Sequence, residues 1–531
     1  DVYKSAKHTD FDKYTEDDYG RKGSYSYGTG EAFNYEADFT LNYSKNFMEK
    51  HQLYVGLGYN FAQEKNEFFT ILAEGISNIN MDFLGMASMY EKDGHPQSSE
   101  GFSRRMGGIA NVNYTYDRRY FVDASFKIEG SSKFGSDNRY APFWSVGIGW
   151  NLHHEAFMMD NNLLNVARLK LSYGTSGSQA FNSYQAMTTF KDYGGSSYQG
   201  WYGVYLMAMG NSDLGWQKTK QLNVGAELEF FNGRIRINAD YYNKVTDDLL
   251  SDITLPSSSG FGSYKANVGQ VANTGVELGV NVYVFRDTKR DLTWLIGGTL
   301  AHNKNEIKKI SNSLEFLNDQ MSSEDGGNPS FMYEEGQSMN TIFAVKSKGI
   351  DPSNGKEIYI KKDGTETYTW DAKDKVPCGI NEPKIWGNLN TMFRYKGITL
   401  NAIFGYRYGG QMYNYTLVSK VENIYPFDNA DKRVLYDRWK NPGDNAFFKG
   451  VRDFTTTNAT SRFVMDENTL ECRSISLGYD WEAKWLDQVG ISYLTITGYM
   501  EDVFRISSIK QERGLSYPFS RKFSVSLSVR F

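Results

Sequence analysis

The sequence lacks the features that mark most other classes of large protein. Its two cysteines, Cys378 and Cys472, do not define a disulfide framework, and the pattern leaves open one disulfide or two unpaired thiols. No segment approaches the roughly 18 unbroken apolar residues of a transmembrane helix. The net charge of -5 mixes both signs, so no nucleic-acid partner is indicated. Asp1 opens no basic and apolar leader, so we expect that the chain is not a primary translation product.

What the chain does contain favours strands. It has 15% aromatic residues, 38 Tyr and 51 Gly but only 10 Pro in 531 residues, which is a strand-prone and turn-rich composition. Its mean hydropathy of -0.55 resembles that of a soluble protein. A membrane barrel with a polar lumen averages to a similar value, because only alternate residues meet lipid.

The C-terminal segment 521–531 alternates without a break. Its two faces are Phe523, Val525, Leu527, Val529 and Phe531 on one side, and Lys522, Ser524, Ser526, Ser528 and Arg530 on the other. The apolar face meets a core in a soluble sandwich and lipid in a transmembrane barrel. One strand does not decide between them.

Further alternating segments favour the barrel. Residues 33–44 and 53–61 form a predicted hairpin, and 110–116 and 120–129 form a second. Asn232-Gly233 is the strongest hairpin signal, since both residues tolerate positive φ, and Lys396-Gly397 joins two more alternating runs. The count reaches about fifteen strands, with a weaker pair between Ile342 and Ile360. We therefore predict an all-β, antiparallel transmembrane barrel.

Connection lengths predict the direction of the barrel. Short turns near Asp117, Asn232 and Lys396 fall on one side and long linkers on the other, and outer-membrane barrels have short periplasmic turns and long external loops. The long linkers are 62–103, 175–216, 246–270 and 409–469. We expect residues 1–32 to be an external loop and 33–531 to be barrel with long external loops. Open strand edges are not tolerated in lipid, so another polypeptide or segment must supply the remaining strands.

Several motifs, in order along almost the whole chain, resemble those of SusC/RagA-like TonB-dependent outer-membrane transporters. They are GSSKFGSDNRYAPFWSVGIGW (130–150), LKLSYGTSGSQ (169–179), LGWQKTKQLNVGAELEFFNGRI (214–235), LPSSSGF (255–261), NVGQVANTGVEL (267–278), RWKNPGD (438–444) and SYPFSRKFSVSLSVRF (516–531).

This resemblance implies a 22-stranded barrel with an internal plug and an upstream TonB box in a Gram-negative outer membrane. About fifteen strands then correspond to strands eight to twenty-two, with the plug absent from this chain. The implied partners are a SusD-like surface lipoprotein acting as a lid, the TonB complex, the plug-bearing portion of the transporter, and membrane lipid. The implied function is energised import of a bulky nutrient, a glycan or a peptide.

Two motifs invite enzymatic or metal-binding readings that we set aside. His153-His154 has no spaced carboxylate or Cys partner, so we expect a periplasmic turn. The GTSGS run at 174–178 does not fit the G-x-S-x-G pattern and has no helix after it, so we expect a polar loop. We therefore expect that the chain has no catalytic residue and is not an enzyme.

Three external segments are interpreted as structural. The turns DPSNG (351–355) and KKDG (361–364) lack the ligand spacing of an EF-hand, so we expect plain turns and no cofactor, with a surface calcium as the alternative. Asp428 followed by 432–439 predicts one short capped helix that folds its loop.

An aromatic cluster in the linker 175–216 is the candidate contact site. Its rings can pack on the loop itself, contact a partner, or stack on a ligand. The cluster comprises Tyr198, Trp201, Tyr202 and Tyr205.

Two rival functions remain from the sequence. A passive porin shares the lipid face but lacks the ordered motifs, and a transporter-like barrel can serve as a structural subunit of a surface assembly. Substrate identity does not follow from these residues.

The alternation predicts lipid-facing residues, and the terminal Phe531 is the expected assembly signal. An Arg at Leu228 is expected to cost about 2–4 kcal/mol, and an Arg at lumen-facing Glu227 little. The predicted lipid-facing set is Phe39, Leu41, Val224, Leu228, Ile237, Val525 and Leu527.

Overall fold

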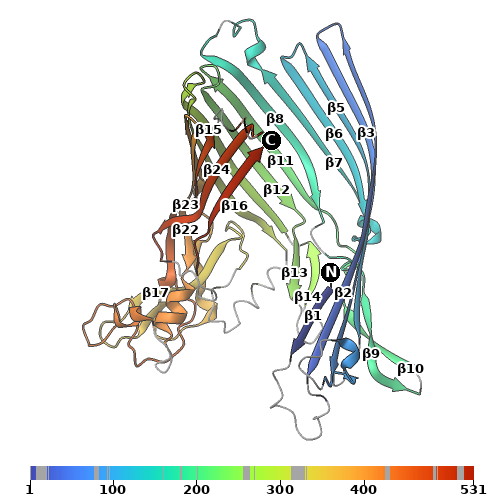
Figure 1. The fold of residues 1–531 in the computed structure, drawn as a ribbon. Coiled ribbons are helices and arrows are strands. Elements are labelled where there is room, and N and C mark those ends of the chain that lie inside the picture. The colour runs from blue at the N-terminus through green and yellow to red at the C-terminus, as the bar shows by residue number, and fades with distance from the viewer. Residues whose placement is uncertain are drawn as a thin grey trace.

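The computed structural model is built around one curved antiparallel sheet (Figure 1). Of the 531 residues, the structure describes 2–7, 21, 23–76, 83–91, 94, 96–159, 161–179, 182–199, 201–254, 263–267, 269–311, 318, 329, 332–424, 431–481, 486, 488, 490–510 and 519–531. No helix among them is long and apolar enough to cross a membrane.

Within this part of the chain the sheet has 17 strands, and all but the short β1 and β4 are long. Each long strand pairs with the next in chain order. They are β2 (Ser24–Phe47), β3 (His51–Glu74), β5 (Gln97–Tyr116), β6 (Tyr120–Ser131), β7 (Tyr140–Asn151), β8 (Leu164–Ser178), β11 (Gln217–Phe230), β12 (Ile235–Asp247), β15 (Gly269–Asp287), β16 (Leu292–Ile310), β21 (Ile385–Tyr395), β22 (Ile398–Tyr413), β23 (Val464–Trp481), β24 (Tyr493–Ser507) and β25 (Phe523–Arg530). This confirms the predicted barrel fold of about fifteen strands.

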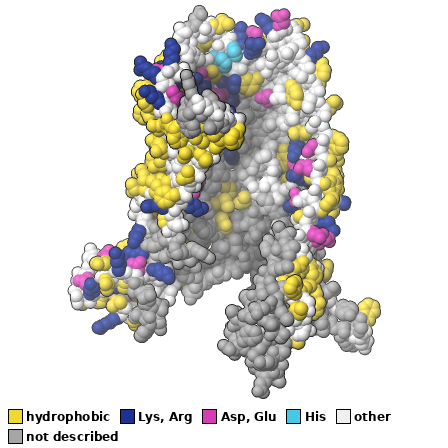
Figure 2. All heavy atoms as spheres, in the orientation of Figure 1, with side chains coloured by type: hydrophobic (Ala, Val, Ile, Leu, Met, Phe, Trp, Pro, Cys, Tyr) yellow, Lys and Arg dark blue, Asp and Glu magenta, His cyan; other side chains and the backbone are white. Residues whose placement is uncertain are grey.

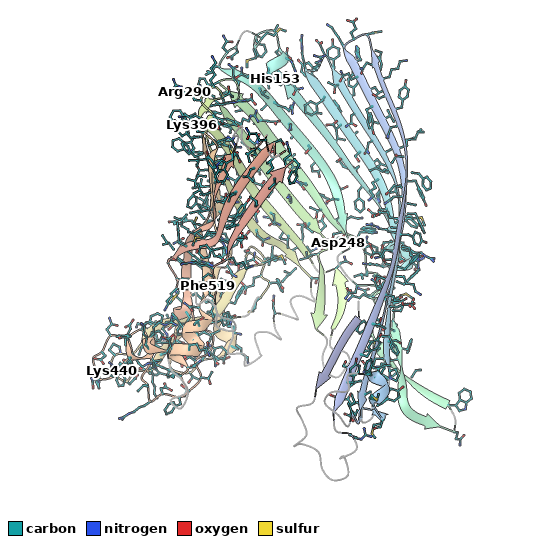
Figure 3. The ribbon with its side chains drawn as sticks, viewed as in Figure 1. His153, Asp248, Arg290, Lys396, Lys440 and Phe519 are labelled. Atoms are coloured by element: carbon teal, nitrogen blue, oxygen red, sulfur yellow. The ribbon has the colours of Figure 1, made fainter. Side chains whose placement is uncertain are left out.

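Tight turns join the strands at one end of the sheet. Asn232 and Gly233 both have positive φ (56° and 77°), as do Lys396 and Gly397 (48° and 82°), so both predicted hairpins form. His153, Arg290 and Lys396 mark this end, and Lys440 and Phe519 lie at the opposite end (Figure 3).

The opposite end carries long connections with structure of their own. The first is shorter than expected, because β3 and β5 run far beyond the predicted bounds of 62 and 103 and leave only 75–96 between them. At about 3.4 Å per residue, the 24 residues of β3 span about 80 Å, much more than a bilayer core. Two connections contain separate hairpins, β9 (Thr189–Tyr198) with β10 (Trp201–Ala208), and β13 (Leu250–Thr254) with β14 (Ser263–Asn267).

The weakly predicted pair between Ile342 and Ile360 exists, but outside the main sheet. Strands β17 (Thr341–Ile350) and β18 (Glu357–Ile360) form a four-stranded sheet with β19 (Glu366–Thr367) and β20 (Lys375–Ile380). This sheet lies beyond the ends of the barrel strands (Figure 1).

The first strands begin earlier than the expected Phe33. β2 starts at Ser24, and β1 (Val2–Lys7) pairs with its first residues, from Lys7 opposite Ser24 to Val2 opposite Thr29. β4 (Met89–Tyr90) is a short addition to the far end of β3. These pairings lie at the end of the sheet that carries the long connections (Figure 1).

The sheet has one apolar and one polar face. Val224 lies opposite Leu171 and Tyr241 in the neighbouring strands, whereas Asn223 lies opposite Ser172 and Tyr242. Hydrophobic side chains gather on the outer side of the wall at the left of Figure 2, and the molecule is hollowed inside the curve. The apolar face therefore points outward and the polar face inward.

Both edges of this sheet are open in the part that the structure describes. β25 pairs only with β24, and β2 beyond Thr29 pairs only with β3. A cluster of buried apolar residues lies at the end with the long connections and includes Phe134, Phe143 and Trp216. A second cluster lies under the small sheet and is described below.

Candidate ligand path and external loop module

The inward face of the barrel carries paired charges and amides. Glu227 on β11 accepts hydrogen bonds from Arg168 Nη1 (3.1 Å) and Lys170 Nζ (3.2 Å) on β8. Asn223 Nδ2 donates to Ser172 Oγ in the same row (3.3 Å). Such a row of polar side chains faces water, so the wall can line a hydrated path.

A second group of charged side chains lies at the end of the barrel with the short turns. Arg394 on β21 donates to Asp291 Oδ1 (2.9 Å) in the turn before β16, and to Asp480 Oδ2 (2.7 Å) on β23. Asp291 Oδ2 also accepts from the backbone N of Gly397 (2.9 Å). These bonds tie two adjacent turns to the strands beside them.

An amide network lies toward the opposite end of the path. Asn273 Oδ1 on β15 accepts from Asn303 Nδ2 (3.1 Å) and Asn305 Nδ2 (2.9 Å) on β16. Asn303 also donates to Glu382 Oε1 (3.1 Å) and accepts from Tyr242 Oη (3.2 Å). Nearly all these groups already have a partner, so the network holds the strand ends in place.

The network borders a pocket of about 550 Å³ where the wall divides. β16 pairs with β21 only as far as Ala301, opposite Trp386, and then continues along β15 alone to Ile310. The pocket lies beside this division, and most of the residues that line it have polar side chains. It is lined by His302, Asn303, Lys304, Asn305, Ser338, Ile380, Glu382, Pro383, Lys384, Tyr408, Gly409, Gln411, Asp466 and Asn468.

Two long connections fold together beyond the barrel. We call the described residues of 332–384 and 414–463 the loop module. It contains β17–β20, one short helical element of the first connection and four of the second. A shared apolar core holds the two connections together, and a parallel bridge joins Val345 to Thr460. The core comprises Ile342, Val418, Val421, Val434, Phe448 and Phe463, with Tyr413 at the end of β22.

A buried charged cluster lies next to this core. The side chains of Arg462, Glu357 and Glu422 are 4%, 4% and 0% exposed. Arg462 Nη2 donates to Glu357 Oε2 (2.7 Å) and Glu422 Oε1 (2.6 Å), and Arg462 Nε donates to Glu357 Oε1 (3.1 Å). Glu357 comes from the first connection and the other two from the second, so the cluster joins both.

Two more buried cations hold the second connection to itself. Arg438 Nη1 donates to the carbonyl of Lys449 (3.0 Å) and Arg438 Nε to that of Val434 (3.1 Å). Lys449 Nζ donates to the carbonyl of Thr455 and lies 3.9 Å from Asp453 Oδ1. Burial lowers the pKa of Lys449, because the charged ammonium loses hydration.

The molecule thus has a wall with a polar inner side, an apolar outer face and large folded connections at one end. The model of the family described as "TonB dependent receptor-like, beta-barrel" matches residues 2–530. The chain belongs to this family. Its members are outer-membrane barrels of Gram-negative bacteria and are transporters, not enzymes.

Curated relatives of this TonB-dependent receptor barrel include SusC from Bacteroides thetaiotaomicron, 26% identical over 80% of this chain and 43% of SusC. The TonB-dependent receptor P39 from Formosa agariphila is 23% identical over 94% of this chain and 53% of its own length. The chain thus spans about half the length of the curated relatives that it matches.

Among solved structures, the RagAB peptide transporter superimposes with a TM-score of 0.81 at 22% identity, over 92% of this chain and 53% of that chain. The RagAB peptide importer in its open-open state gives 0.82 at the same identity, over 96% of this chain and 56% of that chain. These matches confirm the fold, and with SusC they confirm the resemblance inferred from the sequence motifs.

The structure places the predicted lipid-facing residues of this receptor barrel on the outward face. Phe39, Leu41, Val525 and Leu527 are more than 60% exposed, Val224 is 46% exposed, and Leu228 and Ile237 are half-buried by their neighbours. Leu228 lies two residues from the end of β11, so Val224 is nearer the middle of the strand. Contact with lipid stays a prediction.

One expectation about the inward face changes. Glu227 does face inward, but it is paired with Arg168 and Lys170, so an Arg there brings three cations together. Like charges at contact distance repel, so we now expect an Arg at Glu227 to reduce the stability of the barrel.

The predicted aromatic contact residues lie in the β9–β10 hairpin. Tyr198 ends β9, Trp201 and Tyr202 begin β10, and Tyr205 follows on the same strand opposite Lys191. Trp201 is 80% exposed and Tyr205 43% exposed, and the hairpin projects from the molecule (Figure 1). A role in contacting a partner or ligand stays a prediction.

The motifs that were set aside have structural roles. His153 and His154 form a single helical turn between β7 and β8, at the short-turn end, where His153 Nδ1 lies 3.0 Å from the carbonyl oxygen of Ala167. GTSGS is not the expected loop, because residues 174–178 continue β8 and pair with β11. The described residues contain no group of three His, Cys, Asp or Glu placed to hold a metal.

The two acidic turns close on themselves. Asp351 Oδ1 accepts from the backbone N of Ser353 (2.8 Å), and Asp363 Oδ1 accepts from that of Thr365 (2.9 Å). The hydrogen bond from Tyr368 Oη holds the pKa of Asp351 below its usual value. Both turns satisfy their carboxylates locally, and calcium binding stays untested.

The expected capped helix is shorter than predicted. A single helical turn spans Lys432–Leu435, and Asp431 caps it by accepting from Arg433 N (2.9 Å). Asp428 lies outside the described residues. The turn buries Val434 in the loop-module core, so it folds its loop as expected.

The cysteines are unpaired, with Cys378 half-buried in β20 and Cys472 buried in β23. Sequence reasoning missed the charged cluster and the amide network. Asn303 and Asn305 alternate on one strand face, which signals an inward row, but no local pattern marks Arg462 or its partners.

Proposed function

We propose that this chain forms the larger part of the wall and the external surface of a TonB-energised importer for a bulky nutrient, a glycan or a peptide. The observation that carries the proposal is the family match over residues 2–530, combined with a barrel wall whose inner face carries paired charges and amides. A hydrated wall of this kind provides a path for polar cargo.

The open edges of the sheet support a larger assembly. Unpaired backbone groups along β2 and β25 are not tolerated in hydrocarbon, so further strands must close the barrel. We infer that they come from a plug-bearing portion of the same transporter, through which TonB acts. SusC and the RagAB peptide transporter, to which the chain is similar, guide this inference.

We further propose a SusD-like surface lipoprotein as the lid. The loop module and the β9–β10 hairpin offer a large external surface for such a partner. Trp201 and Val204 of the hairpin are 80% and 63% exposed, which favours burial against another protein.

Uptake by cells that carry or lack the transporter gene tests this function. Labelled oligosaccharides and oligopeptides are supplied with and without an uncoupler of the inner-membrane proton gradient, and the complex is purified from native membranes. We expect one cargo class to enter only with the gene and the gradient, and a surface lipoprotein to co-purify. Cargo uptake that is unchanged by the uncoupler indicates a passive porin. A stable complex that gives no uptake indicates a structural subunit.

A further inference from the structure

A second pocket, of about 620 Å³, lies between the two connections of the loop module. The first connection contributes residues 354–357, 359 and 368–369, and the second contributes eight residues between Trp439 and Thr457. The lining includes the buried side chains of Glu357, Lys449 and Thr457, so the pocket rests on the charged cluster. Neither connection forms it alone.

The carboxylates that line this pocket are already occupied. Glu357 Oε1 accepts from Thr460 Oγ1 (2.7 Å) as well as from Arg462. Asp453 Oδ1 accepts from the backbone N of Thr455 (3.0 Å) and from its Oγ1 (2.6 Å). Both negative charges are thus offset by groups of the protein itself.

Four donors that line the pocket have no hydrogen-bond partner among the described residues, although the Lys356 ammonium is attracted to the nearby Asp453 carboxylate. The exposed Lys356 ammonium and Arg452 guanidinium make no hydrogen bond or ion pair with any residue that the structure describes, and neither do the hydroxyls of Thr369 and Thr456. Charged donors without acceptors favour an incoming oxyanion, because hydrogen bonds between ions are about twice as strong as neutral ones.

An aromatic ring stands at the same pocket. Tyr368 is 52% exposed, and its hydroxyl is held by Asp351 Oδ2 (2.5 Å) and Asn354 Nδ2 (3.3 Å), which fixes the ring. A fixed, exposed ring next to donors suits a sugar ring that carries an anionic group.

We propose that this pocket binds an acidic oligosaccharide, with Lys356 and Arg452 holding its carboxylate, sulfate or phosphate group. The site lies on the external module, outside the barrel wall, and its occupancy is independent of transport. Binding therefore tests it without any uptake measurement, and failure of the proposed import leaves this test unaffected.

The test measures affinity by calorimetry with the full-length transporter complex in detergent. The probes are an oligogalacturonate, a sulfated galactan oligosaccharide, inorganic phosphate, a neutral galactan oligosaccharide and oligoglutamate. The double variant Lys356→Ala/Arg452→Ala removes both of these cations. The control Lys361→Ala/Lys362→Ala removes the same charge from an exposed turn of the same module, outside the pocket lining.

We expect at least one acidic saccharide to bind, to lose about tenfold or more in affinity in the first variant, and to keep its affinity in the control. Which anionic probe binds identifies the oxyanion. Thr456→Val is expected to weaken the same probe without altering the fold. Absence of binding by all acidic saccharides, equal losses in both double variants, or tighter binding of oligoglutamate than of any saccharide each overturns the proposal.

Discussion

Replacing Arg462 with Ala is expected to open the loop module. The substitution leaves the carboxylates of Glu357 and Glu422 buried and close together, without the cation to which both are hydrogen-bonded. Removing one partner of a buried ion pair typically costs about 3–5 kcal/mol, because the remaining charge is uncompensated. Since about 1.4 kcal/mol corresponds to a factor of ten, the equilibrium constant for local opening of the module rises roughly 150- to 4,000-fold.

Hydrogen exchange of the module amides measures this change directly. Amides of β17, β18 and residues 457–463 are expected to exchange faster by that factor, while the barrel strands β11 and β12 stay protected. The matched control is the triple variant Arg462→Met/Glu357→Gln/Glu422→Gln. It removes all three charges and is expected to recover most of the protection.

Lowering the pH is expected to reduce the destabilisation of the loop module in the Arg462→Ala variant. Burial without a cation raises the pKa of a glutamate carboxyl group above its usual value of about 4.3. The folded variant therefore gains stability as the pH falls, and it loses this stability as the pH rises through the raised pKa. Unchanged exchange in Arg462→Ala at pH 8, or a defect that grows on acidification, would refute the role given to the cluster.

Two other substitutions and one deletion test separate parts of the structure. Val224→Arg is expected to cost about 2–4 kcal/mol in an unfolding measurement in lipid, whereas Arg at the inward neighbour Asn223 costs little; equal losses contradict the assignment of faces. Deletion of Phe531 is expected to impair membrane insertion, measured by heat-modifiable mobility, and normal insertion removes its role as an assembly signal. Gly355→Ala is expected to destabilise the module by about 2–3 kcal/mol, since φ is +75° and a Cβ meets the Trp439 ring at 2.5 Å; proteolysis no faster than in the wild type contradicts this.

The barrel was predictable from the sequence because its information is local. Alternation at spacing two defines each strand, and turn residues such as Asn232-Gly233 define where strands reverse. The extensions of β3 and β5 were not predicted because a strand of 24 residues is longer than a bilayer core, and an alternation between lipid and water marks only the part of a strand that crosses the bilayer.

The loop module was not predictable, because its contacts are distant along the chain. Arg462 is 105 residues from Glu357 and 40 residues from Glu422, and no local period links them. The same holds for the pocket at Lys356 and Arg452. The prediction of a loop at GTSGS was wrong for another reason. Pairing with β11 along residues 174–178, and with β7 at Gly174, outweighed the turn-like composition of the segment.

The shared cluster at Arg462 restricts how the outer surface can change in evolution. Surface loops usually accept insertions and exchanges independently, because each is anchored only at its own ends. Here the connection before β21 supplies Glu357 and the connection before β23 supplies Arg462 and Glu422, so replacing either one leaves a buried charge unmatched. A transplant of this surface between relatives must carry both connections as one unit.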